Sequence, residues 1–414
     1  MGVGGLSSRR YDEQRSFLNE SSSASSRARI LYYVDRYLPA SQSFVAQQAK
    51  ALTRYQPEVL AGRLVDSPSR AIGDFRVHDI SGSYAMRAGE LAVKLARLPV
   101  PSVFPAVREA ALVHAHFGKN GYVIGPLAMA AGKPLVTTFH GFDATYDGSA
   151  KAAGGFNQAR FFAHGRREMA GWNSWNVAVS DFIAKRLKAL GFADDRVFRH
   201  YIGVDTNLFH LRAGERQRSR AVSISRFVEY KGHRYIVDAL AEVQKSGIPV
   251  ELVMVGQGPL RQEIESYAQR RVAQVKVIDR LSQTEVADLL ATARVYVHGS
   301  VTLDSGHAEA FGITNLEAQA VGTPVVAFRS GGVEEAMIDG QTGTAVGERD
   351  VGAMASAIAA LLTDDGQWQS YSRSAAEMVA DRFDIRTQSA RLEDYYDTVL
   401  AAHGAGRERQ LNAS

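Results

Sequence analysis

Two glutamates, Glu309 and Glu317, stand eight residues apart in the stretch AEAFGITNLEAQAVGTPVV, and their spacing limits the chemistry they can share. Along a continuous helix such a separation is about 12 Å. A retaining glycosidase needs its two carboxylates within roughly 5 Å, so the spacing argues against a glycosidase pair. We expect the two carboxylates to bind different ends of one extended ligand. The alternative is that Glu317 is an ordinary solvent-facing helix residue.

The same stretch predicts a short helix whose N-terminus can bind an anion. Apolar residues recur at helical spacing, and glycine and proline follow where the helix must stop. Phe311 and Gly312 then form the helix entrance, where unpaired N–H groups and the positive end of the helix dipole attract negative charge. The residues that define the helix are Ile313, Leu316, Ala320, Gly322 and Pro324.

Two cations follow an apolar run upstream, in SISRFVEYKGH. Arg226 comes directly after the run and Lys231 five residues later, with Gly232 allowing a close approach of backbone. Arginine binds a diphosphate as a fork and lysine as a point charge, so the pair predicts a diphosphate site. Two solvated surface cations are the alternative. Gly256 and Gly258 in VGQGPL could let a nucleotide pass closely, although they lack the full dinucleotide motif.

Polar residues also follow two apolar runs of the first half. His140 ends one run in TTFHGFD, and His116 and Lys119 follow another in VHAHFGKNGY. We expect these residues to contact substrate, although an isolated histidine is more often structural. Asp143 fits equally well as the N-cap of the segment that follows. His114 and His116 alternate along a strand without a third metal ligand, which favours packing or substrate contact over a metal site.

A repeated unit positions these residues: a β-branched run, a turn with glycine or a polar cap, and an amphipathic helix. Nearly continuous apolar strands that alternate with helices predict parallel sheets, and two sets predict two doubly wound domains. Ligands of such sheets lie beyond the carboxyl ends of the strands, where the motifs cluster. The predicted strands are RILYYVD, PEVLAG, ALVHAHF, PLVTTFH, WNVAVS, RAVSISRF, VELVMVG, VKVID, RVYVHGS and TPVVAF.

Length and composition agree with two globular domains. The 414 residues are too many for one ordinary core, and 45% hydrophobic with 22% charged residues is typical of a soluble globular protein. The absence of cysteine excludes disulfides, cysteine-ligated zinc and thiol nucleophiles, and fits a reducing cytosol. No apolar run is long enough to span a membrane, and residues 1–28 are expected to be a disordered tail and not a signal peptide.

The net charge of +4 conceals an asymmetry between the two halves. Residues 1–210 hold 26 Lys and Arg against 17 Asp and Glu, a net +9, and the remainder holds 22 against 27, a net −5. The cations do not alternate with aromatics as a single-stranded nucleic-acid surface requires, so anionic lipid is the favoured partner. In residues 83–98, Arg87 and Lys94 flank an apolar stripe as in an interfacial helix, although a helix packed on its sheet gives the same pattern.

The segments SRFVEYKG, EAFGITNLE and AVGTPVVAFRSGGVEE together resemble the retaining glycosyltransferases of family 4, which have the GT-B fold. Glu309 and Glu317 match the E-x7-E motif, and the order and spacing of the segments agree. The resemblance runs from about residue 29 to residue 402. It implies an α/β protein of two Rossmann-like, doubly wound domains facing across a cleft. The first would span 29–205 with a crossing helix at about 386–402, the second 206–385, followed by a flexible tail at 403–414.

The resemblance implies roles for the charged residues. Arg226 and Lys231 match the cations that hold the donor diphosphate and neutralise the leaving group. Glu317 matches the carboxylate that accepts both ribose hydroxyls, and Glu309 the one that reaches the sugar hydroxyls. His140 matches a histidine that faces the donor sugar. The expected catalytic residues are therefore His140, Glu309, Arg226 and Lys231.

The resemblance also implies contacts made by the backbone. Phe311, Gly312 and Ile313 match the segment whose amides meet the phosphates and the transferred sugar. Arg280 and Leu281 occupy the place whose backbone reads the base.

The acceptor side departs from the family's common Gly-Gly loop. The stretch YLPASQSF instead resembles a loop of exopolysaccharide transferases, in which Ser41 and Gln42 can offer hydrogen-bond donors. Together with His116 and Lys119, they are the expected acceptor-side residues. The segment before Glu309 is also longer than in the simplest members, and both departures favour a polysaccharide-building enzyme.

The resemblance implies a hexosyltransferase that uses a UDP- or GDP-sugar donor and a saccharide acceptor, for which a lipid-linked oligosaccharide is favoured. A same-face displacement with retention is expected, and because no D-x-D triplet occurs, neither metal nor other cofactor is expected. The predicted setting is cytoplasmic, in bacterial exopolysaccharide or cell-surface glycan synthesis, without nucleic acid. Attachment to the anionic inner face of the membrane is a further hypothesis. A nucleotide-sugar 2-epimerase and a non-catalytic nucleotide-sugar-binding protein are the alternatives.

Overall fold

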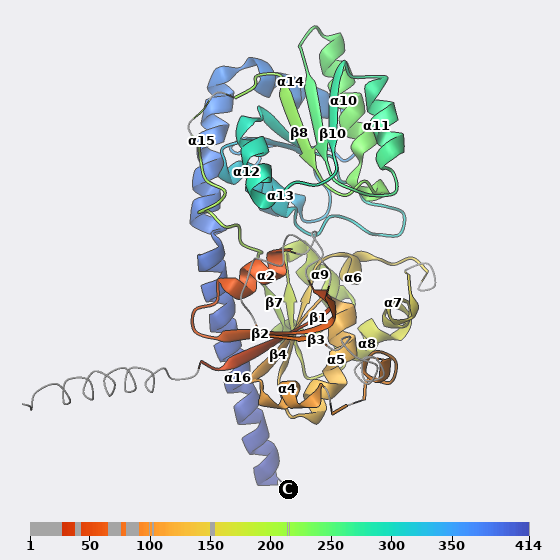
Figure 1. The fold of residues 1–414 in the computed structure, drawn as a ribbon, viewed down its shortest axis with the longest axis vertical. Helices are drawn as coiled ribbons and strands as arrows, with labels where there is room; N and C mark the ends of the chain where they lie inside the picture. The colour runs from red at the N-terminus through yellow and green to blue at the C-terminus, as the bar shows by residue number, and fades with distance from the viewer. Residues whose placement is uncertain are drawn as a thin grey trace, which may run out of the picture.

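The computed structural model describes residues 27–37, 43–64, 76–79, 91–98, 100–101, 103–149, 154–212, 214 and 216–413. These residues form two parallel sheets with helices packed around them, one domain above the other in Figure 1. The predicted fold class, two doubly wound α/β domains, is confirmed.

The first sheet has seven strands in the order β3-β2-β1-β4-β5-β6-β7, and all neighbouring strands are parallel. Strands β4, β5 and β6 are buried at every position, as expected for strands covered on both faces. The strands are β1 (Arg29–Tyr37), β2 (Gln56–Leu64), β3 (Arg76–Asp79), β4 (Leu112–His116), β5 (Leu135–Phe139), β6 (Trp175–Ala178) and β7 (Val197–Arg199).

The second sheet has six parallel strands in the order β10-β9-β8-β11-β12-β13. In both sheets the strand order reverses beside the first strand, at β1 and at β8, which is where open parallel sheets bind ligands. The strands are β8 (Arg220–Ile224), β9 (Glu251–Val255), β10 (Gln274–Ile278), β11 (Val295–His298), β12 (Val325–Phe328) and β13 (Gly343–Val346).

Helices connect the strands. Among the described residues, no helix combines the length and apolar character needed to cross a membrane. The first domain contains α2 (Ser43–Lys50), η3 (Ala92–Ala96), α4 (Phe104–Glu109), α5 (Gly118–Ala130), α6 (Phe142–Thr145), α7 (Phe156–Arg160), η4 (Phe161–Gly165), α8 (Arg166–Ala170), α9 (Asp181–Ala189) and η5 (Asp194–Arg196). After these come η6 (Glu229–Lys231), α10 (His233–Lys245), α11 (Arg261–Gln269), α12 (Gln283–Thr292), α13 (Ile313–Ala320), η7 (Val333–Ala336), α14 (Val351–Thr363), α15 (Asp365–Arg382) and α16 (Ile385–Ala413).

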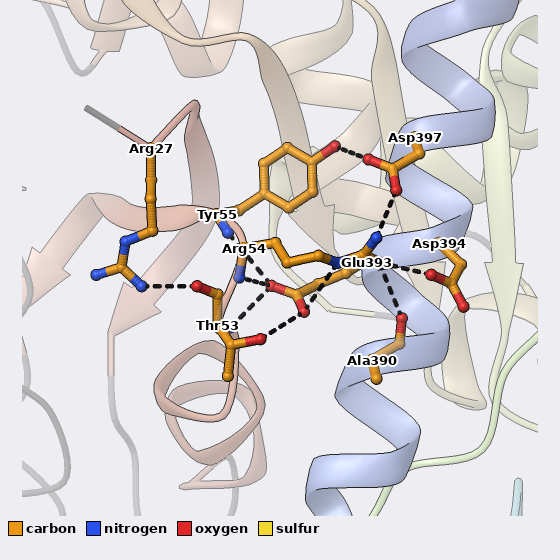
Figure 2. A network of polar contacts seen from close by, with 8 residues as sticks. All are labelled: Arg27, Thr53, Arg54, Tyr55, Ala390, Glu393, Asp394 and Asp397. Atoms are coloured by element: carbon orange, nitrogen blue, oxygen red, sulfur yellow. Dashed lines mark hydrogen bonds and ion pairs between the residues drawn. The ribbon is translucent and has the colours of Figure 1, made fainter. Parts of the chain in front are cut away.

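The last helix, α16, leaves the second domain and runs along the first, as Figure 1 shows. Its buried Glu393 accepts hydrogen bonds from the backbone N–H of Thr53 (2.8 Å) and Arg54 (2.7 Å), just before β2. The Arg54 guanidinium in turn pairs with Asp394 (2.6 Å) and Asp397 (2.7 Å), which completes the network in Figure 2. The helix adds three buried residues to the core formed with β1 and β2: Leu392, Tyr396 and Val399.

The two chain crossings between the domains lie side by side. The backbone N–H of Val204 donates to the carbonyl of Phe383 (2.8 Å), and the N–H of Ile385 donates to the carbonyl of Val204 (2.9 Å). Next to the crossings, the Tyr201 ring stacks on the Phe311 ring, with centroids 5.1 Å apart. An apolar core therefore continues from one domain into the other.

Candidate functional site

The helix predicted from GITNLEAQAVG is α13, and its entrance is fixed by packing. Gly312 precedes it with a φ of +90°, a left-handed conformation that glycine adopts without strain. The Phe311 side chain is only 2% exposed and stacks on the Tyr201 ring. The helix entrance is therefore packed against the residues next to the interdomain crossing. An eight-residue helix follows, whose N-terminus can receive an anion.

Glu309, three residues before Gly312, forms an ion pair with Lys231 that is largely buried. Ser300 donates a hydrogen bond to the same carboxylate at 3.2 Å, and His298 Nε2 lies 3.6 Å away. Burial alone would raise the pKa of Glu309, but the Lys231 ammonium outweighs it and holds the pKa well below its usual range. Burial alone would lower the pKa of Lys231, but the Glu309 charge raises it instead. Both groups are therefore charged.

Glu317 lies one turn into α13 and, unlike Glu309, has a raised pKa. Among the described residues, it has neither a hydrogen-bond nor an ion-pair partner for its carboxylate. Burial raises the pKa of Glu317 to about 8. An acid in this position gains from a ligand whose hydroxyls donate to the carboxylate, because they would replace the water it has lost.

Arg226 and Lys231 lie on the turn after β8, as expected, but they have different surroundings. The exposed Arg226 guanidinium donates to the Tyr230 hydroxyl at 3.2 Å, while Lys231 reaches inward to Glu309. A Cβ on Gly232 would come within 1.9 Å of the Gly299 carbonyl oxygen, which confirms the expected close backbone approach.

Gly256 and Gly258 are explained by the protein's own backbone. A Cβ on Gly256 would lie 1.9 Å from the Ser225 carbonyl oxygen, and one on Gly258 would lie 2.4 Å from that of Phe227. The packing of the turn after β9 on the turn after β8 therefore requires both glycines without any nucleotide. Beyond β10, Arg280 is exposed and donates from Nε to Gln257 (2.8 Å), whereas Leu281 packs on the core.

His140 stands at the carboxyl end of β5 and is partly buried among rings. Its Nε2 lies 3.1 Å from His116 Nδ1. The centroids of the Phe117 and Phe44 rings lie 4.5 and 5.0 Å from the centroid of the His140 ring. Burial lowers the pKa of His140 to about 3, so the ring is neutral. Its Nδ1 has no hydrogen-bond partner among the described residues.

Asp143 holds the loop around His140. Its buried carboxylate accepts hydrogen bonds from the backbone N–H of Gly118 (2.7 Å), His140 (3.0 Å) and Gly141 (2.9 Å). The N-cap position before α6 is occupied by Gly141, so Asp143 fixes the loop and does not cap the helix. Phe117, next to Gly118, has a φ of +73°, a strained conformation of the kind found beside functional sites.

Two of the expected acceptor-side residues, His116 and Lys119, are described, and each contacts other residues of the first domain. His116 is buried between His114 and His140, with ring centroids 4.5 and 5.3 Å away. Lys119, one turn further, pairs with Asp35 at 2.9 Å. Ser41 and Gln42 lie outside the described residues.

No group of three or more potential metal ligands occurs among the described residues. His114 instead hydrogen-bonds to Thr138 (2.7 Å) and to Tyr396 of α16 (2.6 Å). It links the sheet to the crossing helix.

The His140 loop and the Glu309 loop touch across the domain boundary. A Cβ on Gly141 would come within 2.9 Å of the Ala310 Cβ, and Asp147 N–H donates to the Ser305 carbonyl at 2.7 Å. The segment 300–312 of the second domain therefore contacts the residues that follow β5 in the first domain. Sequence reasoning missed His298, Ser300 and His307 here, although His307 lies only two residues before Glu309.

Comparisons with known proteins agree with this geometry. Residues 43–208 match the family described as Glycosyltransferase Family 4, and residues 213–378 match Glycosyl transferases group 1. A GDP-mannose-dependent alpha-(1-6)-phosphatidylinositol monomannoside mannosyltransferase from Mycolicibacterium smegmatis is 30% identical over 287 residues, 66% of this chain and 72% of the relative. The putative colanic acid biosynthesis glycosyltransferase WcaL of Salmonella typhimurium is 27% identical over 295 residues, 69% of this chain and 70% of that protein.

Solved structures resemble the whole fold. Anabaena HepE in complex with UDP-glucose superimposes with a TM-score of 0.70 at 18% identity, over 89% of this chain and 99% of that one. WaaG, a glycosyltransferase involved in lipopolysaccharide biosynthesis, gives 0.63 at 16% identity over 88% and 99%. At these identities the likeness establishes the two-domain GT-B fold.

Proposed function

The chain belongs to the glycosyltransferases of family 4, and we propose that it transfers a hexose from a nucleoside diphosphate sugar to a saccharide acceptor with retention of configuration. The observation that carries the proposal is the charged Lys231–Glu309 pair before the entrance of α13, together with the unpaired Glu317 inside that helix. A cation, a helix N-terminus and a half-buried hydroxyl acceptor match the diphosphate and ribose of such a donor.

In this proposal the diphosphate lies between Arg226, Lys231 and the N-terminus of α13. These groups concentrate positive charge where negative charge grows on the leaving group, so they stabilise the transition state more than the ground state. Arg226, Lys231 and the helix dipole supply the positive charge that a metal provides in other transferases, so we expect transfer without a divalent cation.

The transfer itself is a same-face displacement. The bond between the anomeric carbon and the diphosphate oxygen breaks as the acceptor oxygen bonds to that carbon, and the acceptor proton moves to the departing phosphate oxygen. Glu309 is engaged with Lys231 and Ser300, which supports a binding role for its carboxylate and not that of a nucleophile. Neutral His140 would face the donor sugar and accept or donate one hydrogen bond without adding charge.

A lipid-linked oligosaccharide is the acceptor we propose. Support comes from the net charge of +9 on residues 1–210 and from three exposed leucines on and beside η3: Leu91 (57%), Leu95 (41%) and Leu98 (54%). The name of one relative, a phosphatidylinositol monomannoside mannosyltransferase, is that of an enzyme whose sugar acceptor carries a lipid. The proposed setting is the cytoplasmic face of an anionic membrane.

Donor binding is tested by saturation-transfer NMR on the purified protein with UDP-glucose, UDP-galactose, UDP-GlcNAc, GDP-mannose and NAD. We expect transfer to one nucleotide sugar, weakened in Arg226→Ala and unaffected in Arg218→Ala, whose exposed side chain pairs with Asp365. Incubation of that sugar without acceptor, followed by anomer and epimer analysis, separates transfer from 2-epimerisation. Binding of NAD alone would contradict the proposed function.

A further inference from the structure

A buried hydrogen bond joins the two domains beside the proposed donor site. His307 Nδ1 lies 2.8 Å from Thr145 Oγ1. His307 belongs to the loop between β11 and α13, two residues before Glu309, while Thr145 ends α6, five residues after His140. The bond therefore connects the segments that carry the two residues expected to contact the transferred sugar.

The direction of this hydrogen bond follows from the second partner of Thr145. The Thr145 hydroxyl lies 3.0 Å from the Gly141 carbonyl, which can only accept. The hydroxyl has one proton and donates it there, so it must accept from His307 Nδ1–H. Burial lowers the pKa of His307 to about 4, in agreement with a neutral ring whose Nε2 carries the lone pair.

His307 also contacts the donor side of the site. Its ring meets the Tyr230 ring edge to face, with centroids 4.4 Å apart. The Tyr230 hydroxyl accepts from Arg226 at 3.2 Å, and the Lys231 ammonium lies 5.0 Å from the Tyr230 ring centroid. One imidazole thus touches the turn that carries both expected diphosphate cations and the loop that carries His140.

We propose that His307 is a positioning residue that sets the His140 loop relative to the Arg226–Lys231 turn through its Nδ1–H bond to Thr145. The inference rests on the proposed function, because the aligned groups are those expected to hold the donor. The alignment affects the transferred sugar and not the nucleotide, which binds to the second domain. Loss of the bond should therefore reduce kcat and leave donor affinity nearly unchanged.

Matched substitutions separate the bond from the bulk of the side chain. In His307→Asn an amide nitrogen takes the place of Nδ1, whereas in His307→Gln it takes the place of Nε2. Thr145→Ser keeps the hydroxyl, and Thr145→Val removes it at nearly the same volume. We expect H307Q and T145V to lower kcat about fivefold or more, the worth of one buried hydrogen bond, and H307N and T145S to retain most of it.

The double variant H307Q/T145V should be no slower than the slower of the two single variants, since each of them already removes the His307–Thr145 bond. Thr363→Val, which alters an exposed hydroxyl within α14, is the control for threonine-to-valine changes, and thermal unfolding of each variant detects simple destabilisation. Three results would overturn this inference alone. They are an equal loss of kcat in H307N and H307Q, a wild-type kcat in T145V, and a loss of kcat in the double variant that equals the product of the two single losses. A wild-type protein that binds none of the nucleotide sugars would overturn the proposed function with it.

Discussion

The Lys231 ammonium contacts the Glu309 carboxylate across 78 residues of sequence, and both side chains are about seven-eighths buried, with exposed fractions of 14% and 13%. An ion pair in this position holds the turn after β8 against the loop before α13. Its charges are aligned before any ligand arrives, which is how a site stabilises developing charge without reorganising.

The first prediction concerns this pair. Lys231→Met and Glu309→Gln each leave one charge without its partner, so each should lower the free energy of unfolding by about 3 kcal/mol. The double variant removes both charges and should lose less than the sum of the singles. Urea unfolding of the four proteins measures this, and additive losses would mean that the pair contributes no interaction energy.

The second prediction is a pH dependence of stability at Glu317. The pKa of this carboxyl is raised from 4.5 to about 8 in the folded protein, so the folded state binds the proton more tightly than the unfolded state. Its protonated form favours folding fully below pH 4.5, and that contribution is lost as the pH rises through 8. Glu317→Gln has no proton to lose at this position, so its stability lacks this pH-dependent contribution. The stability of the wild type relative to E317Q should therefore fall between pH 5 and pH 9, and parallel curves would contradict the prediction.

The third prediction links the same carboxyl to the donor. If ribose hydroxyls donate to Glu317, binding must favour the carboxylate, and the protein should release a proton from this site on donor binding at pH 7. Calorimetry in buffers of different ionisation enthalpy counts that proton. E317Q should bind more weakly and release none from this site. Equal proton release by the two proteins would mean that Glu317 does not meet the ribose.

The fourth prediction concerns the contact between the domains at Gly141. Its φ is +130°, and an added Cβ would come within 2.9 Å of Ala310 in the other domain. Gly154 is the matched control, with a φ of +125°. Among the described residues, an added Cβ there would meet only the Gln158 side chain within 4 Å, at 3.8 Å. Gly141→Ala should reduce turnover about tenfold relative to Gly154→Ala, since the loop is displaced. Equal turnover in the two variants would show that the domains tolerate the extra methyl.

The fifth prediction concerns the membrane. The protein should float with liposomes that contain anionic lipid and stay at the bottom with zwitterionic ones. Serine at Leu91, Leu95 and Leu98 should abolish flotation, because it removes the exposed apolar groups on and beside η3. Leu211→Ser, at a leucine of 51% exposure outside the basic half, is the control. Flotation that is unaffected by the triple change would place the contact elsewhere.

The central strands could be predicted from sequence because they are buried on both faces and read as continuous apolar runs. The strands that the pattern did not reveal, β3, β7 and β13, all lie at sheet edges and are at most four residues long. Edge strands are often short, and a run of three or four residues is too brief to give a clear apolar pattern.

The pairings among the candidate site residues could not be predicted from sequence. The motif identified Lys231 and Glu309 separately, and their contact depends on the neighbouring turns of the sheet. His116 shows the opposite case, since its place after an apolar run suggested a cleft position and the stack of His114 and His140 encloses it. His307 and Thr145 carried no sequence signal, because their bond exists only where two domains meet.

The paired crossings at Val204 and Phe383–Ile385 have a consequence for synthesis of the chain. They make the second domain an insertion within the first, whose core is completed by Leu392, Tyr396 and Val399 of α16. On the ribosome, the inserted domain can fold whole while the domain begun earlier still lacks its last helix. The first domain is therefore the first to begin folding and the last to complete it. A chain truncated before residue 385 would lack the α16 residues that complete the core with β1 and β2.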